Sequence, residues 1–504
     1  MIKDYIKAQI LSNFGHSPTI DQEKTITALA DFVCDKDDSA VLVLRGFAGT
    51  GKTSLVGAFV KTMEAAQRPC VLMAPTGRAA KVFALYASHP AYTIHKQIYR
   101  QRSIEQNSSF NLDYNKQRNA IFIVDEASMI SDNMHTATYG GAGSESLQST
   151  TGGSLLDDLI AFVYGIHQTA APLTACRLIL VGDTAQLPPV GDTDSPALQC
   201  DTLRLHGLTP RTATLTQIVR QAETSGILWN ATHLRQLIEQ EEVYAFPRIR
   251  FAGFADVKNV PGNELIDTLG NCYARYGMDE VMVVCRSNKR ALAYNNGIRN
   301  QILDREEELS SGDLVMIAKN NYHWLKPPTQ TASSATPERT PTSFLANGDI
   351  AVVRRIRNTR ELYGFRFADC QLRLPDYDDY ELEATVLLDT LHAEAPALTH
   401  EQQDGLYNKV MEDYTDIPQK RERLQQLRVD AHFNALQVKY AYAVTCHKAQ
   451  GGQWSHIFID QGYMTDDMLG IDYFRWLYTA ITRATSTVYF VNWRPEQTLE
   501  NVEK

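Results

Sequence analysis

The chain has 504 residues, which is too long for one compact core and predicts two to four domains. Its composition, 44% hydrophobic and 21% charged, is typical of a globular protein, and no apolar run approaches the roughly 18 residues of a membrane helix. The cysteines form no Cys-x-x-Cys pair, which argues against disulfides and structural metal and favours a cytoplasmic location. The net charge of −10 disfavours nucleic-acid binding by bulk charge, although a local basic track suffices for a protein that slides.

Short apolar runs alternate with helical stretches along the chain. They predict strands at Ala40–Leu44, Val71–Met73, Ile121–Val124 and Leu178–Val181, and helices such as Ser54–Ala66 and Leu155–Val163. Apolar strands that alternate with helices form parallel sheets covered on both faces, so this half predicts an α/β unit. A second α/β unit is predicted from the runs Val281–Cys285, Ile457–Ile459 and Thr487–Asn492.

Three stretches interrupt this alternation. Residues 97–119 predict a small β-hairpin, whereas the Gly/Ser/Thr-rich residues 133–154 and the Pro/Thr/Ser-rich residues 325–342 predict loops. An insertion at about 310–435 begins with strands around the Asn347-Gly348 turn and ends in the charged helical stretch Glu401–Arg428.

We therefore expect three domains. The first α/β domain covers residues 1–275, and the second is formed by 276–309 together with 436–504. Residues 310–435 form the inserted accessory domain between the two parts of the second.

The segment Gly46–Thr53 fits the phosphate-loop pattern G-x-x-x-x-G-K-[ST], and it lies between an apolar strand and a helical stretch, as that motif requires. Glycines allow backbone N–H groups to approach phosphates, and the helix start adds positive potential. Lys52 is expected at the β- and γ-phosphates, and Thr53 on Mg²⁺. The sequence predicts ATP binding by the residues Gly49, Thr50, Gly51, Lys52, Thr53 and Ser54.

An acidic pair, Asp125-Glu126, directly follows the predicted strand Ile121–Val124. Asp125 is expected to hold Mg²⁺ through water, and Glu126 to polarise the attacking water. The third strand-end cluster is Gly182-Asp183-Thr-Ala-Gln186-Leu-Pro-Pro189, where Gln186 would lie beside the γ-phosphate.

This last cluster resembles a specific pattern of the superfamily 1 helicases, and further motifs follow in the expected order over about residues 20–490. They are Gln22, Ala74–Ala80, Thr93–Lys96, Leu215–Gln221, Val284–Asn288, Thr445–Gly451 and Tyr478–Ala484. The resemblance implies that Gln22 reads adenine and that Arg286 belongs to the nucleotide site. Arg220 and Arg483 are the candidate cations for the charge on the transferring phosphoryl group.

Hydroxyl and basic groups at loop tips suit contacts with strand phosphates. The candidate nucleic-acid contacts are Pro75, Thr76, Thr93, His95, Thr445 and His447, with His95 open to a capping or core role. Three aromatic residues, Phe83, Tyr322 and Trp324, either stack on bases or belong to the core.

Within the superfamily, the Thr-x-His-Lys segment, the hairpin region and the insertion resemble the RecD/Dda-like branch. The resemblance implies two RecA-like motor domains, with the hairpin as a wedge and an SH3-like β insertion in the second. It also implies an ATP-dependent helicase that moves 5′→3′ on single-stranded DNA and opens forked DNA. We further expect activity as a monomer and no membrane partner. Two alternatives stay open: an RNA-directed helicase, and an ATP-gated clamp that remodels without unwinding.

Overall fold

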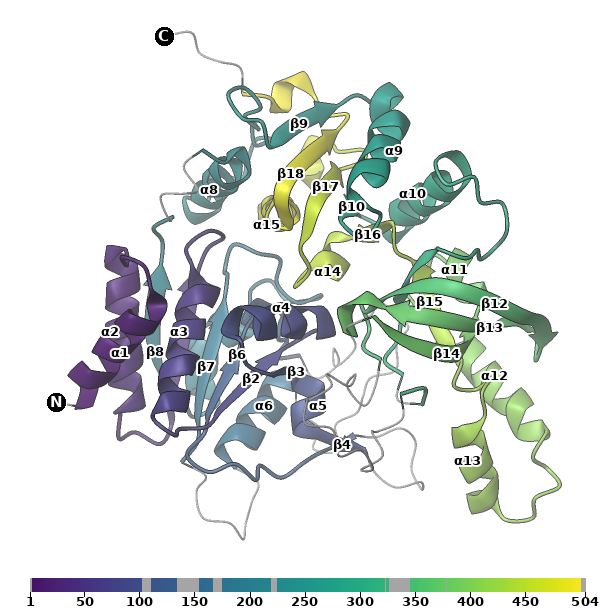
Figure 1. The fold of residues 1–504 in the computed structure, drawn as a ribbon, viewed down its shortest axis with the longest axis horizontal. Coiled ribbons are helices and arrows are strands. Elements are labelled where there is room, and N and C mark those ends of the chain that lie inside the picture. The colour runs from purple at the N-terminus through teal and green to yellow at the C-terminus, as the bar shows by residue number, and fades with distance from the viewer. Residues whose placement is uncertain are drawn as a thin grey trace.

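The computed structural model describes residues 2–101, 110–133, 154–165, 175–218, 224–321, 323–325, 345–377 and 379–499. These residues form two parallel sheets with helices on their faces, a closed barrel and a two-stranded ribbon (Figure 1). Within the described chain, no helix has both the length and the apolar character needed to cross a bilayer.

The first unit is built on a six-stranded sheet in which every printed pairing is parallel. In sheet order its strands are β3 (Ala91–Thr93), β2 (Cys70–Ala74), β6 (Ile121–Val124), β7 (Arg177–Gly182), β1 (Ala40–Gly46) and β8 (Thr209–Leu215). Its helices are α1 (Ile2–Phe14), α2 (Ile20–Val33), α3 (Lys52–Ala65), α4 (Gly77–Ala87), α5 (Ile94–Ile98), α6 (Leu155–Tyr164) and α7 (Cys200–Leu205).

Alternate residues of β1 face two different cores. Leu42 and Leu44 belong to the core shared with α1, α2 and α3, whereas Val41 and Val43 belong to the core shared with α5 and α6. This two-sided burial explains why the strands are continuous apolar runs. Because β6, β7 and β1 are neighbours and parallel, the residues that follow them meet at one edge of the sheet.

The second unit is a five-stranded sheet, again with every printed pairing parallel. Its strands are β16 (Ala443–Thr445), β10 (Val281–Cys285), β17 (Trp454–Asp460), β18 (Ala484–Val491) and β9 (Val257–Val260). Its helices are α8 (Gly226–Glu239), α9 (Leu265–Tyr276), α10 (Asn288–Gln301), α14 (Cys446–Ala449) and α15 (Ile471–Ile481).

The predicted boundary between the two α/β domains is wrong. We expected the first domain to extend to residue 275, but β9 pairs with β18 and α8 packs against α15 of the second unit. Only the first and last residues of β9 are buried. Because the strand has so few apolar residues, the sequence gives no recognisable signal for it.

The insertion is a closed five-stranded barrel with helices inserted before its last strand. Its strands are β11 (Leu314–Ile317), β12 (Ile350–Leu362), β13 (Phe365–Leu374), β14 (Tyr380–Leu387) and β15 (Leu436–Tyr440), and α11 (Asp389–His392), α12 (His400–Glu412) and α13 (Lys420–Val429) lie between β14 and β15. The expected end at residue 435 is therefore too early, since β15 pairs with both β11 and β14 to close the barrel.

The ribbon consists of β4 (Tyr99–Gln101) and β5 (Phe110–Leu112), which pair antiparallel where a hairpin was predicted. Most of the two predicted loops, residues 134–153 and 326–344, lies outside the described residues. The predicted fold class is confirmed: an α/β protein with two parallel-sheet units, a hairpin and a β insertion in the second unit.

The chain on either side of residues 134–153 is held together. The Ser154 hydroxyl donates to Asp132 at 2.8 Å. The His206 ring lies 3.1 Å from Asp132 and 2.8 Å from Asp157, so it bridges the two carboxylates. The two described ends of the chain at this gap therefore lie side by side in the first unit.

Candidate nucleotide site and nucleic-acid interface

The loop between β1 and α3 carries the phosphate-loop motif. Gly49 and Gly51 adopt φ values of 75° and 80°, which cost glycine little and other residues much more. The Lys52 ammonium donates to the carbonyl oxygens of Gly46 at 2.5 Å and Phe47 at 2.9 Å. A Cβ at Gly46 would lie 2.8 Å from the Lys52 side chain. The loop therefore requires its glycines and holds a cation at the start of a helix, as phosphate binding demands.

Gln22 also lies at this loop. Its side chain is 2% exposed and donates to the Thr50 carbonyl at 2.9 Å. The same side chain accepts from the backbone of Thr19 in a capping box that begins α2. Thr53 is half-buried and Ser54 exposed in the first turn of α3. The adenine-reading role of Gln22 stays a prediction, but its place beside the loop fits it.

The acidic pair follows β6. The Asp125 N–H donates to the Met73 carbonyl at 2.9 Å, which anchors the strand end beside β2. Glu126 has a left-handed φ of 52°, and its N–H donates to the Asp125 carboxylate at 2.9 Å. Burial, reinforced by the Glu126 charge, raises the pKa of Asp125 to about 6, while Lys52 and Arg483 oppose the shift.

A half-buried carboxylate with a raised pKa is costly to ionise unless a cation approaches it. Asp125, together with the half-buried Thr53 hydroxyl, offers the oxygen ligands that Mg²⁺ prefers. The donor set at this edge of the sheet therefore fits a nucleotide with its magnesium ion.

The end of β7 contributes a second buried carboxylate. Asp183 is 1% exposed, and burial raises its pKa. It accepts hydrogen bonds from the N–H of Ala185 at 2.9 Å and from the hydroxyl of Tyr478 at 2.6 Å. The Tyr478 oxygen in turn accepts from the N–H of Ala48 at 3.1 Å. One tyrosine of the second unit therefore joins the phosphate loop to the β7 segment.

Gln186 is also brought to this edge. Its side chain is 5% exposed, and the Oε1 atom has no hydrogen-bond partner among the described residues. An amide buried with a free acceptor is unusual. It suits the predicted role of a residue whose partner changes with the state of the nucleotide.

Arg483 reaches across the two units. Its side chain is 5% exposed, and Nη1 lies 3.5 Å from Glu126 Oε1. The Arg483 guanidinium also donates to the carbonyls of Thr479 at 3.3 Å and Gly452 at 3.4 Å, which fix it in the second unit. The predicted cation and the predicted water-polarising carboxylate are therefore neighbours.

Helix α15 and the segment after α14 hold the β7 loop from the second unit. The Thr479 hydroxyl accepts from the Leu187 N–H at 2.9 Å, and the Gln450 amide donates to the Leu187 carbonyl at 2.8 Å. Arg475 lies 2.8 Å from the Asp194 carboxylate. These contacts therefore join the loop after β7, at the candidate nucleotide site, to the second unit.

Two predicted arginines are not placed at this site. Arg220 lies outside the described residues, so its role stays a prediction. Arg286 is exposed on the second unit, where it contacts the Met464 sulfur and lies over the Tyr473 ring at 5.9 Å. The described contacts of Arg286 do not bring it to the phosphate loop.

Sequence reasoning missed a fourth arginine. Arg235 of α8 stacks over the Phe47 ring of the phosphate loop at 4.3 Å and donates to the Thr216 carbonyl at 3.2 Å. From the same helix, Leu228 lies so close to the loop that a Cβ at Gly49 would come within 2.9 Å of it. No motif marks α8, and its helical spacing alone did not show that it covers the loop.

The predicted strand contacts begin at the ends of β2 and β3. The hydroxyls of Thr76 and Thr93 accept from backbone N–H groups at 3.2 Å and 3.3 Å and cap α4 and α5. Pro75 is buried before Thr76, and burial lowers the pKa of His95 to about 4. Gly451 of the second unit packs closely against Thr76, since a Cβ at Gly451 would lie 3.0 Å from the Thr76 hydroxyl.

The base-stacking prediction for Phe83 is wrong. Its ring is 1% exposed and belongs to the core between α3 and the sheet, where no base reaches it. Trp324 is partly buried, and its indole N–H donates to the Asn434 carbonyl at 2.8 Å. Tyr322 lies outside the described residues.

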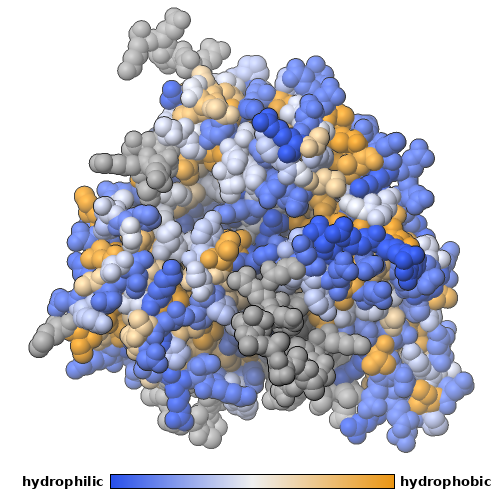
Figure 2. All heavy atoms as spheres, in the orientation of Figure 1, coloured by the Kyte–Doolittle hydropathy of each residue, from blue (hydrophilic) through white to orange (hydrophobic). Residues whose placement is uncertain are grey.

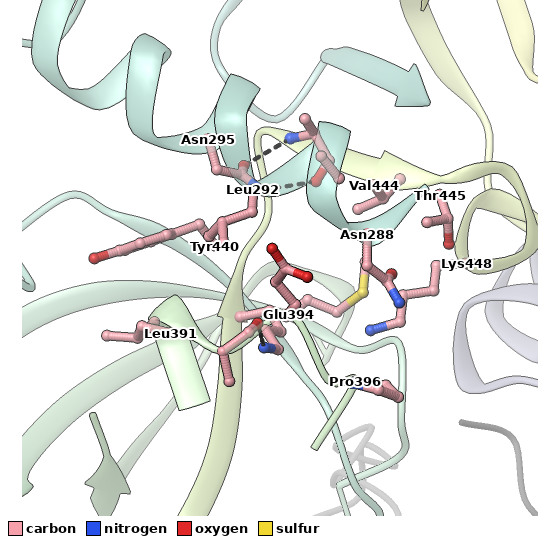
Figure 3. A pocket seen from close by; sticks show the side chains of 15 residues that line it. Asn288, Leu292, Asn295, Leu391, Glu394, Pro396, Tyr440, Val444, Thr445 and Lys448 are labelled. Carbon is pink, nitrogen blue, oxygen red and sulfur yellow. Dashed lines mark hydrogen bonds between the residues drawn. The ribbon is translucent and has the colours of Figure 1, made fainter. Parts of the chain in front are cut away.

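A pocket between α10 and the barrel contains Thr445 together with residues that were not predicted. In Figure 3, the side chains of Asn288 and Lys448 lie beside Thr445, and Lys439 of β15 also lines the pocket. Burial lowers the pKa of Lys448 to about 8. Burial and the nearby Lys448 charge lower the pKa of Lys439 to about 8 as well. His447, by contrast, is exposed at the rim of α14.

Two poorly hydrated ammonium groups near each other favour an anion at this place, and the exposed Glu394 carboxylate also lines the pocket. The pocket also offers a hydroxyl and an amide donor, which suit the oxygens of a phosphodiester. Lys448 belongs to the motif Thr445–Gly451, so the sequence could have indicated it. Lys439 belongs to no motif, because folding alone brings strand β15 to the pocket.

Comparison with known proteins agrees with this arrangement. Residues 21–144 match the family described as an AAA domain, and residues 440–491 match the UvrD-like helicase C-terminal domain. The chain is 31% identical over 189 residues to the ATP-dependent RecD2 DNA helicase of Deinococcus radiodurans. That match covers 37% of this chain and 21% of the relative, so the chain spans only a part of that protein.

Among solved structures, the chain is similar to Pif1 helicase from Bacteroides in complex with ADP-AlF3 and ssDNA, at 14% identity and a TM-score of 0.45, over 96% of this chain and 95% of that one. For Pif1 helicase from Candida albicans the values are 16%, 0.42, 96% and 97%. The two domain matches and the RecD2 relative confirm the resemblance to superfamily 1 helicases of the RecD-like branch that the motifs indicate.

Proposed function

We propose that the protein is an ATP-dependent helicase that moves 5′→3′ along single-stranded DNA and opens forked duplexes. The observation that carries the proposal is the contact of Arg483 with Glu126 at 3.5 Å across the two units. Because the site is completed by residues of one chain, we expect activity as a monomer. Its eight cysteines all lie in the described part of the chain and are unpaired there, which suits a cytoplasmic location.

The residues divide the work of hydrolysis. Lys52 and the N–H groups of the loop bind the phosphates of ATP, and Thr53 and Asp125 hold Mg²⁺, which neutralises charge on the phosphate oxygens. Glu126 orients water and accepts its proton as the oxygen attacks the γ-phosphorus and the bond to the β-phosphate oxygen breaks. Arg483 stabilises the negative charge that develops on the transferring group.

The coupling to movement follows from α15. This helix carries Tyr478, which contacts Asp183, and Thr479, which contacts the β7 loop; Arg483 follows two residues after the helix ends at Ile481. Loss of the γ-phosphate removes the group that Arg483 and Gln186 face, so the two units are free to separate. Cyclic closure of two units that each hold the strand is the physical basis of stepping.

The strand contacts are distributed over both units. In the first unit, Thr76 and Thr93 contact the strand. In the second unit, the contacts come from the pocket of Thr445, Lys448 and Lys439. Gly451 packs on α4 beside Thr76, so the two groups of contacts lie near one interface. The β4–β5 hairpin projects from the end of α5 and suits the role of a wedge.

The test is unwinding of duplexes that carry a single-stranded tail of one polarity. The proposal expects ATP-dependent opening with a 5′ tail. Stimulation of hydrolysis by poly(dT) but not poly(U) supports DNA over RNA, and the reverse favours an RNA-directed enzyme. Hydrolysis that is stimulated by DNA without any strand separation favours an ATP-gated clamp.

A further inference from the structure

One strand of the barrel continues beyond the barrel as a ribbon. Strand β12 pairs with β11 only at Ile350–Val352, whereas it pairs with β13 as far as Leu362. The ribbon turns at Tyr363 and Gly364, whose φ values of 57° and 76° are those of a two-residue hairpin turn. The Arg354 carbonyl still accepts from the Ser311 hydroxyl at 2.7 Å, so β12 has one free edge from Arg355 onward.

Three arginines lie around the start of this free part. Arg354, Arg355 and Arg357 are all exposed, and among the described residues no hydrogen bond or ion pair is found for their guanidinium groups. Figure 2 shows a band of strongly hydrophilic side chains over β12. By contrast, Arg360 and Arg366 of the same ribbon are each bound to a carboxylate, at 2.8 Å and 3.0 Å.

The register keeps these charges on the outside. Between Arg355 and Arg357, Ile356 pairs with the buried Cys370, so the two arginines point to the opposite face. Across the ribbon, Gln371 lies opposite Arg355 and Asp369 lies opposite Arg357, and the Asp369 carboxylate is already bound by Arg360. The positive charge of the three arginines is therefore not neutralised by the ribbon itself.

The far end of the ribbon is braced by the helical part of the insertion. The Tyr363 hydroxyl donates to the Asp413 carboxylate at 2.5 Å, and Lys409 donates to the Tyr363 carbonyl at 3.0 Å. Arg360 lies 3.0 Å from the His432 ring. These contacts hold the ribbon in one orientation and assign a structural role to α12 and the residues after α13.

We infer that this ribbon edge, defined by Arg354, Arg355 and Arg357, binds the sugar–phosphate backbone of duplex DNA. Guanidinium groups without a carboxylate partner attract anions. Because the chain as a whole carries a net charge of −10, we expect this local positive patch to bind a dense polyanion rather than the surface of another acidic protein. Arg355 and Arg357 lie about 7 Å apart along a strand, close to the rise of two nucleotides along the duplex axis at about 3.4 Å each. The inference rests on the proposed function, because a fork supplies the duplex.

The experiment measures DNA affinity by fluorescence anisotropy between about 50 and 200 mM salt, with a 5′-tailed fork and with oligo(dT). The probe proteins are the full chain, the triple variant R354A/R355A/R357A, and the control K36A/K61A/K258A. The control removes the same charge from exposed positions of the two α/β units. Each phosphate contact contributes about 0.9 to the slope of log K against log salt, so three contacts contribute about 2.7.

The inference expects the arginine variant to lose about 2.7 of the slope on the fork, with the oligo(dT) slope and the oligo(dT)-stimulated ATPase unchanged. The control variant should lose much less. An unchanged fork slope, or an equal loss on oligo(dT), overturns the inference while leaving the helicase proposal intact. Failure of DNA to stimulate any hydrolysis in the unaltered chain overturns the proposed function instead.

Arginines on a free sheet edge also prevent pairing with other chains, so aggregation has to be separated from lost binding. The triple variant R354K/R355K/R357K keeps both the edge charge and the counterion release. It should keep most of the fork slope. A lysine variant that remains folded and loses the whole slope contradicts a backbone contact made by charge.

Discussion

Removal of the Arg483 guanidinium is the perturbation that the geometry of the nucleotide site makes most informative. Arg483→Ala deletes a cation that is 5% exposed on its side chain and lies 3.5 Å from Glu126. A unit charge about 4 Å from the transferring phosphoryl group contributes roughly 4 kcal/mol at the effective dielectric of a partly buried site. At about 1.36 kcal/mol per decade, the turnover rate should fall about 10³-fold.

The assay is steady-state phosphate release with saturating oligo(dT), together with equilibrium binding of a fluorescent ATP analogue. We expect kcat to fall while nucleotide affinity changes only a few-fold, because the charge is needed mainly in the transition state. Arg475→Ala is the matched control, since Arg475 also joins α15 to the first unit but contacts Asp194 away from the acids. A kcat for Arg483→Ala within about threefold of the control refutes the assigned role.

Three further changes test the other roles. Lys52→Ala should abolish phosphate release, since the only cation of the loop is lost, while anisotropy still detects oligo(dT) binding; retained turnover removes the phosphate-loop assignment. Glu126→Gln should bind ATP and DNA but release phosphate slowly, and a normal rate would show that another group activates water. Affinity for oligo(dT) should fall as pH rises through about 8, because Lys448 and Lys439 lose their protons there in the free protein and a bound phosphate raises both pKa values. Lys448→Met should weaken binding at pH 7 and flatten this pH dependence, and an unchanged profile would exclude the pocket from the strand path.

The arrangement of the nucleotide site was predictable because it depends on local motifs at strand ends. Once the strands of the first unit are parallel, the residues after β1, β6 and β7 have to meet at one edge, and Lys52, Asp125 and Gln186 do so. The apolar runs located these strands closely because both faces of the sheet are buried, so hydrophobicity alone marks them.

The remaining features depend on contacts between segments far apart in sequence. The sequence leaves Phe83 open between base stacking and the core, and α4 turns that side of the helix into the core. Lys439 and Arg235 acquire their surroundings only when the barrel and α8 pack against other elements. The short β9 has too few apolar residues to be recognised without its partner β18.

The direction of unwinding tests the central claim most directly. The measurement compares two duplexes of the same sequence, one with a 5′ single-stranded tail and one with a 3′ tail, in the presence of ATP and Mg²⁺. A motor of the proposed kind separates the 5′-tailed duplex and leaves the 3′-tailed duplex closed. Opening of only the 3′-tailed duplex contradicts the polarity, and hydrolysis without opening of either contradicts the helicase itself.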